Sequence, residues 1–168
     1  MNNTKIAQQI QILLNQFNAK NFSHVILKAK QLLKKNPGYV ILYNLLGSSY
    51  QNLNNFEEAK INFKEGLKLE PNNIALMNNL GMTYKNLLQY DLADKLFQEI
   101  INKKPNYINA YVNLGNLKRD INKFDEAIEF YQKALKINNK NPVVFYSLAL
   151  AYQGLGKFKQ AIEYGKKT

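Results

Sequence analysis

The sequence predicts an all-α fold built from antiparallel helix pairs that repeat every 34 residues. Pro37, Pro71 and Pro105 are spaced by 34 residues. Aromatic residues recur on the same period along the whole chain, at Phe22, Phe56, Tyr90, Phe124 and Phe158. A fixed period of this length is typical of repeat architectures, in which each repeat packs only on its neighbours. We therefore expect an almost wholly helical chain.

The period divides the chain into five repeats of a single array that spans residues 1–168. The repeats cover residues 6–39, 40–73, 74–107, 108–141 and 142–168. The first is degenerate, because Gln9 and Gln16 stand where aromatic residues are expected. The last is truncated, because it stops inside its second helix. In each repeat, apolar residues recur at helical spacing, break at a polar turn and resume.

Repeat 40–73 shows the pattern of one helix pair. Its apolar faces are expected to hold Tyr43, Leu46, Gly47, Tyr50 and Leu53 on the first helix, and Phe56, Ala59, Phe63, Leu67 and Leu69 on the second. The small residues Gly47 and Ala59 predict a close crossing of the two helices, which a larger side chain would wedge apart.

The ends of the helices carry their own signals. Each of the three prolines spaced by 34 residues is expected just past a helix end, where it blocks continuation and its missing N–H costs nothing. Asn141-Pro142 predicts an N-cap followed by proline at the first helical position of the last repeat.

These residues resemble the tetratricopeptide repeat. The match in repeat 40–73 is carried by Tyr43, Leu46, Gly47, Tyr50, Ala59, Phe63 and Pro71. The resemblance implies a solenoid, a right-handed superhelix of antiparallel helix pairs whose first helices line a concave groove. It also implies a protein–protein interaction scaffold that binds an extended peptide or a partner domain in that groove. Besides Gln9 and Gln16, three residues depart from the pattern, since Lys118 replaces a tyrosine, Asn139 a proline and Gly66 an alanine.

The resemblance places a set of amide and cationic side chains in the groove. These candidate peptide-binding residues are Asn44, Asn78, Asn79, Lys85, Asn109, Asn113, Asn116 and Arg119. The segments around Asn79 and Asn113 are similar to repeats of O-linked N-acetylglucosamine transferases, where an asparagine ladder holds an extended peptide. A side-chain amide offers a donor and an acceptor, so it can pair with any peptide unit.

Two alternatives for these residues stay open. The chain is rich in asparagine everywhere, so composition alone puts some amides in the groove. Lys85 and Arg119 would favour an acidic segment, or they are solvated at the helix end.

The net charge of +11 is unevenly distributed along the chain. Residues 1–56 hold six lysines and no acid, whereas basic and acidic groups nearly cancel in residues 57–136. Arg119 is the only arginine, and nucleic-acid sites usually need the bidentate contacts of arginine. A basic scaffold for RNA is therefore the less favoured alternative.

The sequence holds no recognisable catalytic or metal-binding constellation, so we expect a non-enzyme without cofactors. There is no cysteine, and His24 is the only histidine. The acidic pairs Glu57-Glu58 and Asp125-Glu126 open second helices, where negative charge stabilises the helix dipole. Neither a signal peptide nor an apolar run long enough to cross a membrane is present, which favours a cytoplasmic protein.

A second functional hypothesis is that the repeats form the N-terminal, substrate-presenting or assembly domain of a larger bacterial transferase. Arrays similar to this one precede sulfotransferase or glycosyltransferase domains, and the last repeat stops at Thr168 without a capping helix. The open final repeat also predicts self-association. The residues expected on its uncovered face are Val144, Leu148, Ala151 and Ile162.

Overall fold

The computed structural model describes residues 2–168, and the side chains of residues 4–168. Across that range the chain forms ten helices and no strand, so the predicted all-α fold class is confirmed. The helices are α1 (Asn2–Asn18), α2 (Phe22–Lys35), α3 (Val40–Asn52), α4 (Phe56–Leu69), α5 (Ile74–Asn86), α6 (Tyr90–Lys103), α7 (Ile108–Asp120), α8 (Phe124–Ile137), α9 (Pro142–Gly154) and α10 (Phe158–Gly165).

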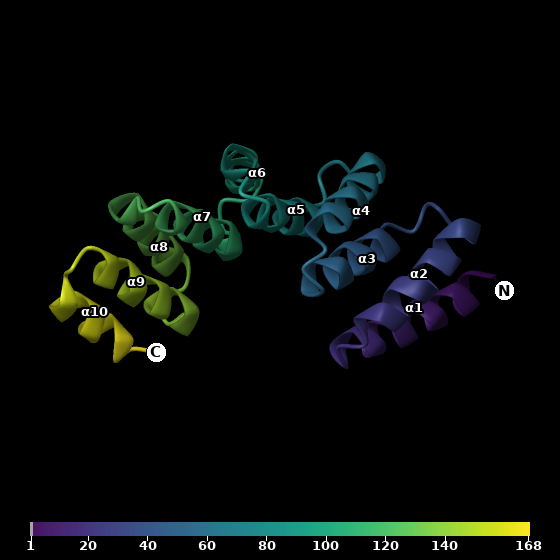
Figure 1. Ribbon diagram of the computed structural model, residues 1–168, viewed down its shortest axis with the longest axis horizontal. Helices are drawn as coiled ribbons and strands as arrows, with labels where there is room; N and C mark the ends of the chain where they lie inside the picture. The colour runs from purple at the N-terminus through teal and green to yellow at the C-terminus, as the bar shows by residue number, and fades with distance from the viewer. Residues whose placement is uncertain (1) are drawn as a thin grey trace. The chain divides into compact units, whose positions relative to one another are not determined.

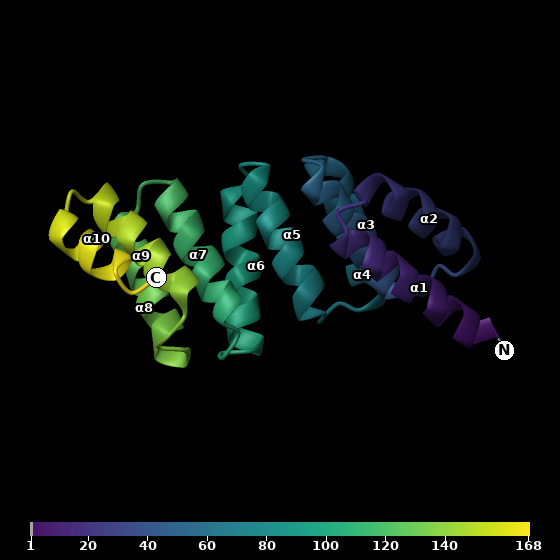
Figure 2. The same cartoon turned by 90° about the horizontal axis from the view of Figure 1, so that it is seen from below.

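The helices belong to two compact units, Met1–Leu88 and Gln89–Thr168. In the first unit, α3 packs closely on α4, and the first helices of successive repeats (α1 and α3, α3 and α5) also touch. In the second unit, α7 packs on α8 and α9 on α10, and α7 lies beside α9 (Figures 1 and 2). Each unit therefore places neighbouring first helices next to each other.

The core of each unit forms where helices of a pair cross. Phe63 on α4 and Tyr131 on α8 are fully buried. An added Cβ at Gly47 would lie 2.6 Å from Cδ1 of Phe63, and one at Gly115 would lie 2.7 Å from Cδ1 of Tyr131. The close crossing predicted at Gly47 is thus confirmed, and the aromatic ring fills the space that glycine leaves.

The predicted helix ends are also confirmed. Pro37, Pro71 and Pro105 directly follow the C-cap residues of α2, α4 and α6. The side chain of Asn141 accepts hydrogen bonds from the backbone N–H groups of Val143 and Val144, and Pro142 is the first residue of α9.

Two apolar residues assigned to the faces of repeat 40–73 are exposed instead. Leu53 is the C-cap of α3 and is 40% exposed, and Leu69 is the last residue of α4 and is 47% exposed. Both lie at a helix end, where the partner helix no longer covers the side chain.

The face assigned to the last repeat was wrong for three of its four residues. Val144, Leu148 and Ala151 are fully buried in a cluster that includes residues of α8, whereas Ile162 on α10 is 60% exposed. On α9 the exposed apolar residues are instead Val143 and Tyr146. The helical phase differs because α8 and α10 together cover the face that the sequence left open.

The turn between the two helices of every repeat has one left-handed residue. Lys20, Asn54, Leu88 and Asn122 have φ near 60°, and Gly156 has φ 71°. These positions are again 34 residues apart, and a left-handed conformation costs a residue with a side chain about 1–2 kcal/mol. Leu88 is the least suited of the five, because leucine lacks the short polar side chain that lets asparagine adopt this conformation.

Replacing Leu88 with glycine is therefore expected to stabilise the protein by about 1 kcal/mol. Leu88 is 70% exposed, so little packing is lost. Urea denaturation of Leu88→Gly and of Asn122→Gly would check this, since asparagine tolerates the conformation and its replacement should gain less. Equal stability of Leu88→Gly and the wild type would contradict the expectation.

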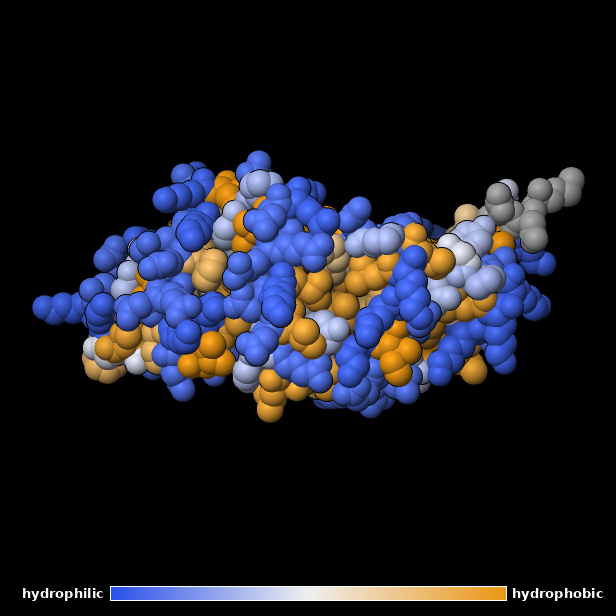
Figure 3. Space-filling model, turned by 90° about the horizontal axis from the view of Figure 1, so that it is seen from above, coloured by the Kyte–Doolittle hydropathy of each residue, from blue (hydrophilic) through white to orange (hydrophobic). Residues whose placement is uncertain are grey.

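On the face seen in Figure 3, hydrophilic residues cover most of the surface, with apolar side chains between them. None of the described helices is long and apolar enough to span a membrane.

Candidate functional site

The first helices of the first unit are joined by side-chain amides. Asn79 Nδ2 on α5 donates a hydrogen bond to Asn44 Oδ1 on α3, at 3.0 Å. Two turns further along, Gln51 Nε2 on α3 donates to Thr83 Oγ1 on α5 at 3.3 Å. Both asparagines are half-buried. We call the surface of α3 and α5 that carries Asn44 and Asn79 the amide face.

The hydrogen bond between Asn79 and Asn44 orients both amides. It uses the donor group of Asn79 and the acceptor of Asn44. The other halves of the two amides are the Asn44 NH₂ group, which is a donor, and the Asn79 carbonyl oxygen, which is an acceptor. A peptide unit offers the complementary C=O and N–H.

Asn78 has a different environment from its neighbour. It is only 6% exposed, and its Nδ2 lies 3.7 Å from the Met82 sulfur on the same helix. Of the two adjacent asparagines that the sequence singled out, Asn79 is therefore the one with an amide at the surface.

The asparagines of α7 in the second unit fall into two groups. Asn109 is exposed and Asn113 is half-buried. Asn116 is tied to the core, because its Oδ1 accepts a hydrogen bond from the buried Tyr131 hydroxyl at 2.7 Å. Burial raises the pKa of Tyr131 to about 12, so the hydroxyl stays protonated and remains a donor at neutral pH.

On α9 the residue equivalent to Asn109 is the apolar Val143, and a second exposed apolar residue, Tyr146, follows it, whereas the residue equivalent to Asn113 is the buried Ser147. Val143 is 60% exposed and Tyr146 is 57% exposed. Val143 stands one repeat after Asn109, and α7 packs beside α9, so these residues lie on the same side of the second unit. We call this surface, with Asn109, Asn113, Val143 and Tyr146, the tyrosine face. Val143 and Tyr146 could have been predicted from the sequence, because both stand at repeat positions that face the groove in tetratricopeptide repeats.

Three family models match the sequence. Two described as Tetratricopeptide repeat match residues 40–73 and 62–95, and one described as TPR repeat matches residues 115–156. Together they cover more than half of the chain. The chain is a tetratricopeptide-repeat protein.

Solved structures of MamA have the same fold. One crystal structure of MamA is 26% identical with a TM-score of 0.75, covering 91% of this chain and 90% of that chain. A second is 25% identical with a TM-score of 0.74, covering 96% and 90%. MamA from residue 41 to its end, from Desulfovibrio magneticus RS-1, is 20% identical with a TM-score of 0.80, covering 96% and 91%. Comparison with curated proteins gives no match.

The two cations predicted for the groove of the tetratricopeptide repeats are both half-buried. Arg119 lies 3.4 Å from the Asp120 carboxylate, so part of its charge is already compensated. Lys85 is in the last turn of α5.

Lys118, the departure from the tetratricopeptide pattern, joins three helices of the second unit. Its ammonium group on α7 lies 2.5 Å from Asp94 on α6 and 3.4 Å from Glu126 on α8. Burial lowers the pKa of Lys118, but the hydrogen bonds and charges of Asp94 and Glu126 outweigh it and hold that pKa above its ordinary value. The lysine replaces the packing of a tyrosine ring with an ion-pair network.

The described residues offer little for catalysis. No three His, Cys, Asp or Glu side chains among them are grouped so that they could hold a metal ion. His24 is exposed on α2. Glu57-Glu58 and Asp125-Glu126 lie in the first turns of α4 and α8, as the sequence indicated. Hydrogen bonding from Lys123, with further help from Lys118, lowers the pKa of Glu126 and so accounts for that carboxylate as part of the ion-pair network.

Proposed function

We propose that this protein binds extended segments of other proteins on its first helices, through the amide face of the first unit and, as a separate surface, the tyrosine face of the second unit. Tetratricopeptide repeats support a protein-binding role in general. The observation that carries the specific proposal is the Asn79–Asn44 hydrogen bond, which joins two half-buried side-chain amides of neighbouring first helices.

The amide face would supply affinity for the backbone. A bound peptide unit would accept a hydrogen bond from Asn44 Nδ2 and donate one to Asn79 Oδ1. Because neither contact depends on the side chain of the peptide, this surface would tolerate many sequences.

The tyrosine face would supply selectivity. Asn109 and Asn113 offer polar contacts to a backbone, and Val143 and Tyr146 beside them offer exposed apolar area. Large amphipathic side chains such as tyrosine often dominate binding energy at protein interfaces. We therefore expect bound segments to carry an apolar side chain that packs on Tyr146.

The test is binding of a peptide selected on the intact protein from a random library displayed on phage. Asn79→Ala should weaken binding of a selected peptide held by the amide face, and Asn113→Ala should weaken binding of one held by the tyrosine face. Each loss should be about 1 kcal/mol, or roughly fivefold, because a peptide group loses its partner. Tyr146→Ala should weaken binding at the tyrosine face about tenfold or more. Isothermal titration calorimetry measures the affinities, and thermal melts verify that each variant is folded.

The matched control is Asn62→Ala on the second helix α4, where the Asn62 side chain donates to the Glu58 carbonyl of its own helix. That variant removes the same chemical group away from both faces and should bind as the wild type does. Selected peptides whose affinity is insensitive to Asn79, Asn113 and Tyr146 would rule the proposal out. Self-association through the last repeat stays a prediction beside it, and Ile162 on α10 is the one residue of the predicted face that is exposed.

A further inference from the structure

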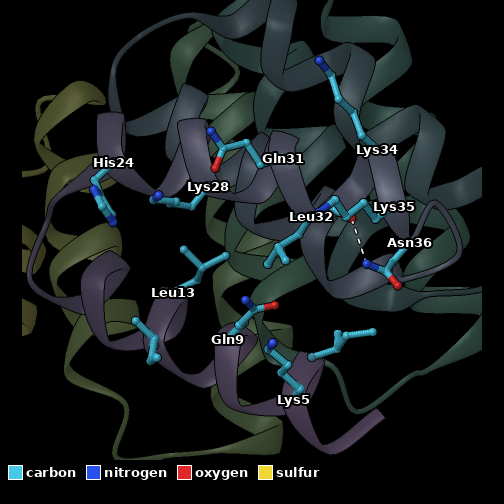
Figure 4. A pocket seen from close by; sticks show the side chains of 12 residues that line it. Lys5, Gln9, Leu13, His24, Lys28, Gln31, Leu32, Lys34, Lys35 and Asn36 are labelled. Atoms are coloured by element: carbon cyan, nitrogen blue, oxygen red, sulfur yellow. Dashed lines mark hydrogen bonds between the residues drawn. The ribbon is translucent and has the colours of Figure 1, made fainter. Parts of the chain in front are cut away.

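We propose that a groove between α1 and α2 is a separate docking site, which takes an acidic amphipathic helix of a partner protein. The groove has a volume of about 680 Å³ and lies wholly within the first helix pair. Figure 4 shows Lys5, Gln9 and Leu13 of α1 across from Lys28, Leu32 and Lys35 of α2. These six residues carry the argument.

The groove exists because the first helix pair is packed differently from the others. Gln9 stands at the repeat position where later first helices have large apolar or aromatic residues, namely Tyr43, Met77, Tyr111 and Phe145. On α2, Leu32 stands where α4 has Gly66 and α8 has Ala134, the small residues that permit close approach. Accordingly, α1 and α2 contact each other less extensively than α3 and α4 or α7 and α8 do.

The floor of the groove is apolar and its stripes run along both helices. Ile6 and Leu13 are 5% and 3% exposed, and Leu32 is half-buried, while Ile12 is 56% exposed at the rim. Residues 6, 9 and 13 of α1 and residues 28, 32 and 35 of α2 follow the three-to-four spacing of one helix face. Of these six residues, the three apolar ones (Ile6, Leu13 and Leu32) form a floor on which the apolar ridge of a third helix can pack, and the polar ones border it.

The charge around the groove selects an acidic occupant. Lys5, Lys28 and Lys35 line it, no Asp or Glu does, and the first acidic residue of the whole chain is Glu57. A helix with an apolar stripe flanked by glutamates would place carboxylates opposite these lysines, which favours its association and its orientation. The groove has an apolar floor and no arginine among its lining residues, and both features favour a protein segment over nucleic acid.

The test uses a synthetic peptide of about 18 residues, long enough to form a helix, with leucines at i, i+3, i+4 and i+7 and glutamates elsewhere. Fluorescence anisotropy of the labelled peptide with the full chain should show binding that weakens as salt is added. The double variant Lys28→Glu, Lys35→Glu should weaken binding about tenfold or more. Lys64→Glu on α4, an exposed lysine outside the groove, is the control for charge reversal and should have little effect.

A second variant separates the groove from general electrostatics. Gln9→Phe puts the aromatic residue of the other repeats into the hollow without changing any charge, and it should abolish peptide binding while the melting temperature stays the same or rises. Retained binding in Gln9→Phe would overturn the proposal. Equally tight binding of a peptide with lysines in place of the glutamates would also overturn it. Binding of single-stranded RNA or of anionic vesicles that Gln9→Phe does not weaken would overturn it too.

Discussion

Gly115→Ala is expected to destabilise the second unit by about 1–3 kcal/mol, although alanine is the better helix former. An added Cβ at Gly115 would lie 2.7 Å from Cδ1 of Tyr131. Tyr131 is fully buried, so its ring has no room to retreat. The overlap therefore outweighs the gain of roughly 1 kcal/mol that the same change brings at an unconstrained helical position.

The chain contains its own control for this substitution. Gly165 ends α10, and no atom lies within 4 Å of an added Cβ there. Gly165→Ala should leave stability unchanged or slightly raised. Guanidinium denaturation of the two variants compares them directly, and a Gly115→Ala protein as stable as Gly165→Ala would mean that the ring of Tyr131 does not constrain this position.

The same pairing explains why the last repeat differs from the others. One repeat after Gly115 stands Ala149, and one repeat after Tyr131 stands Gly165. In the last repeat the second helix has Gly165 in place of a large ring, and the first helix has alanine in place of glycine. The ring position is then partly replaced by Tyr164, whose ring stacks on Tyr152 at 5.4 Å between centroids.

The 34-residue period was sufficient to predict the helices, their prolines and the close crossings. These features depend on residue size and backbone chemistry, which a sequence displays directly. The left-handed turn residues were not predicted, because Leu88 and Lys20 are not residues that favour that conformation. The geometry is imposed there by the two helices that the turn must join.

The binding faces could be predicted only as repeat positions. Asn79 and Asn116 look alike in sequence, yet Asn79 pairs with another surface amide and Asn116 accepts from a core tyrosine. The partner of a side-chain amide depends on the distance between the helices, and the 34-residue period does not specify that distance. Val143 and Tyr146 were overlooked because the ladder interpretation looked for amides alone.

The groove between α1 and α2 was visible in the sequence only as an anomaly. Gln9 and Gln16 indicated only that the first repeat is degenerate. In the structure Gln9 borders a groove with an apolar floor, because Leu32 faces it from the opposite helix. Comparing one repeat position at a time does not bring these two residues together.

The other large effect is expected at Tyr131, which links the core of the second unit to Asn116 on α7. Tyr131→Ala should cost about 3–5 kcal/mol, since it removes a fully buried ring between α7, α8 and α9. Tyr131→Phe keeps the ring and removes only the hydrogen bond to Asn116, so it should cost about 1 kcal/mol.

The wild type and Tyr131→Phe should also differ in how their stability responds to alkaline pH. The pKa of Tyr131 is 10.0 in its ordinary state and about 12 in the folded protein. Between these values the unfolded chain has released a proton that the folded chain still holds, so ionisation favours unfolding and stability falls as pH rises above 10. The stability that comes from the raised pKa of Tyr131 is fully present below pH 10 and is lost as the pH rises through 12. Tyr131→Phe has no hydroxyl to ionise, so its stability does not change in this way.

The measurement is the free energy of unfolding of the wild type and of Tyr131→Phe, taken by urea denaturation at pH 8 and at steps upward from pH 10. Tyr152 and Lys118, whose pKa values are also raised, are present in both proteins, so the difference between the two curves isolates Tyr131. We expect the wild type to be the more stable at pH 8 and the gap to narrow as pH increases. Parallel curves would show that the Tyr131 hydroxyl titrates as it does in water, and would contradict its burial in the folded protein.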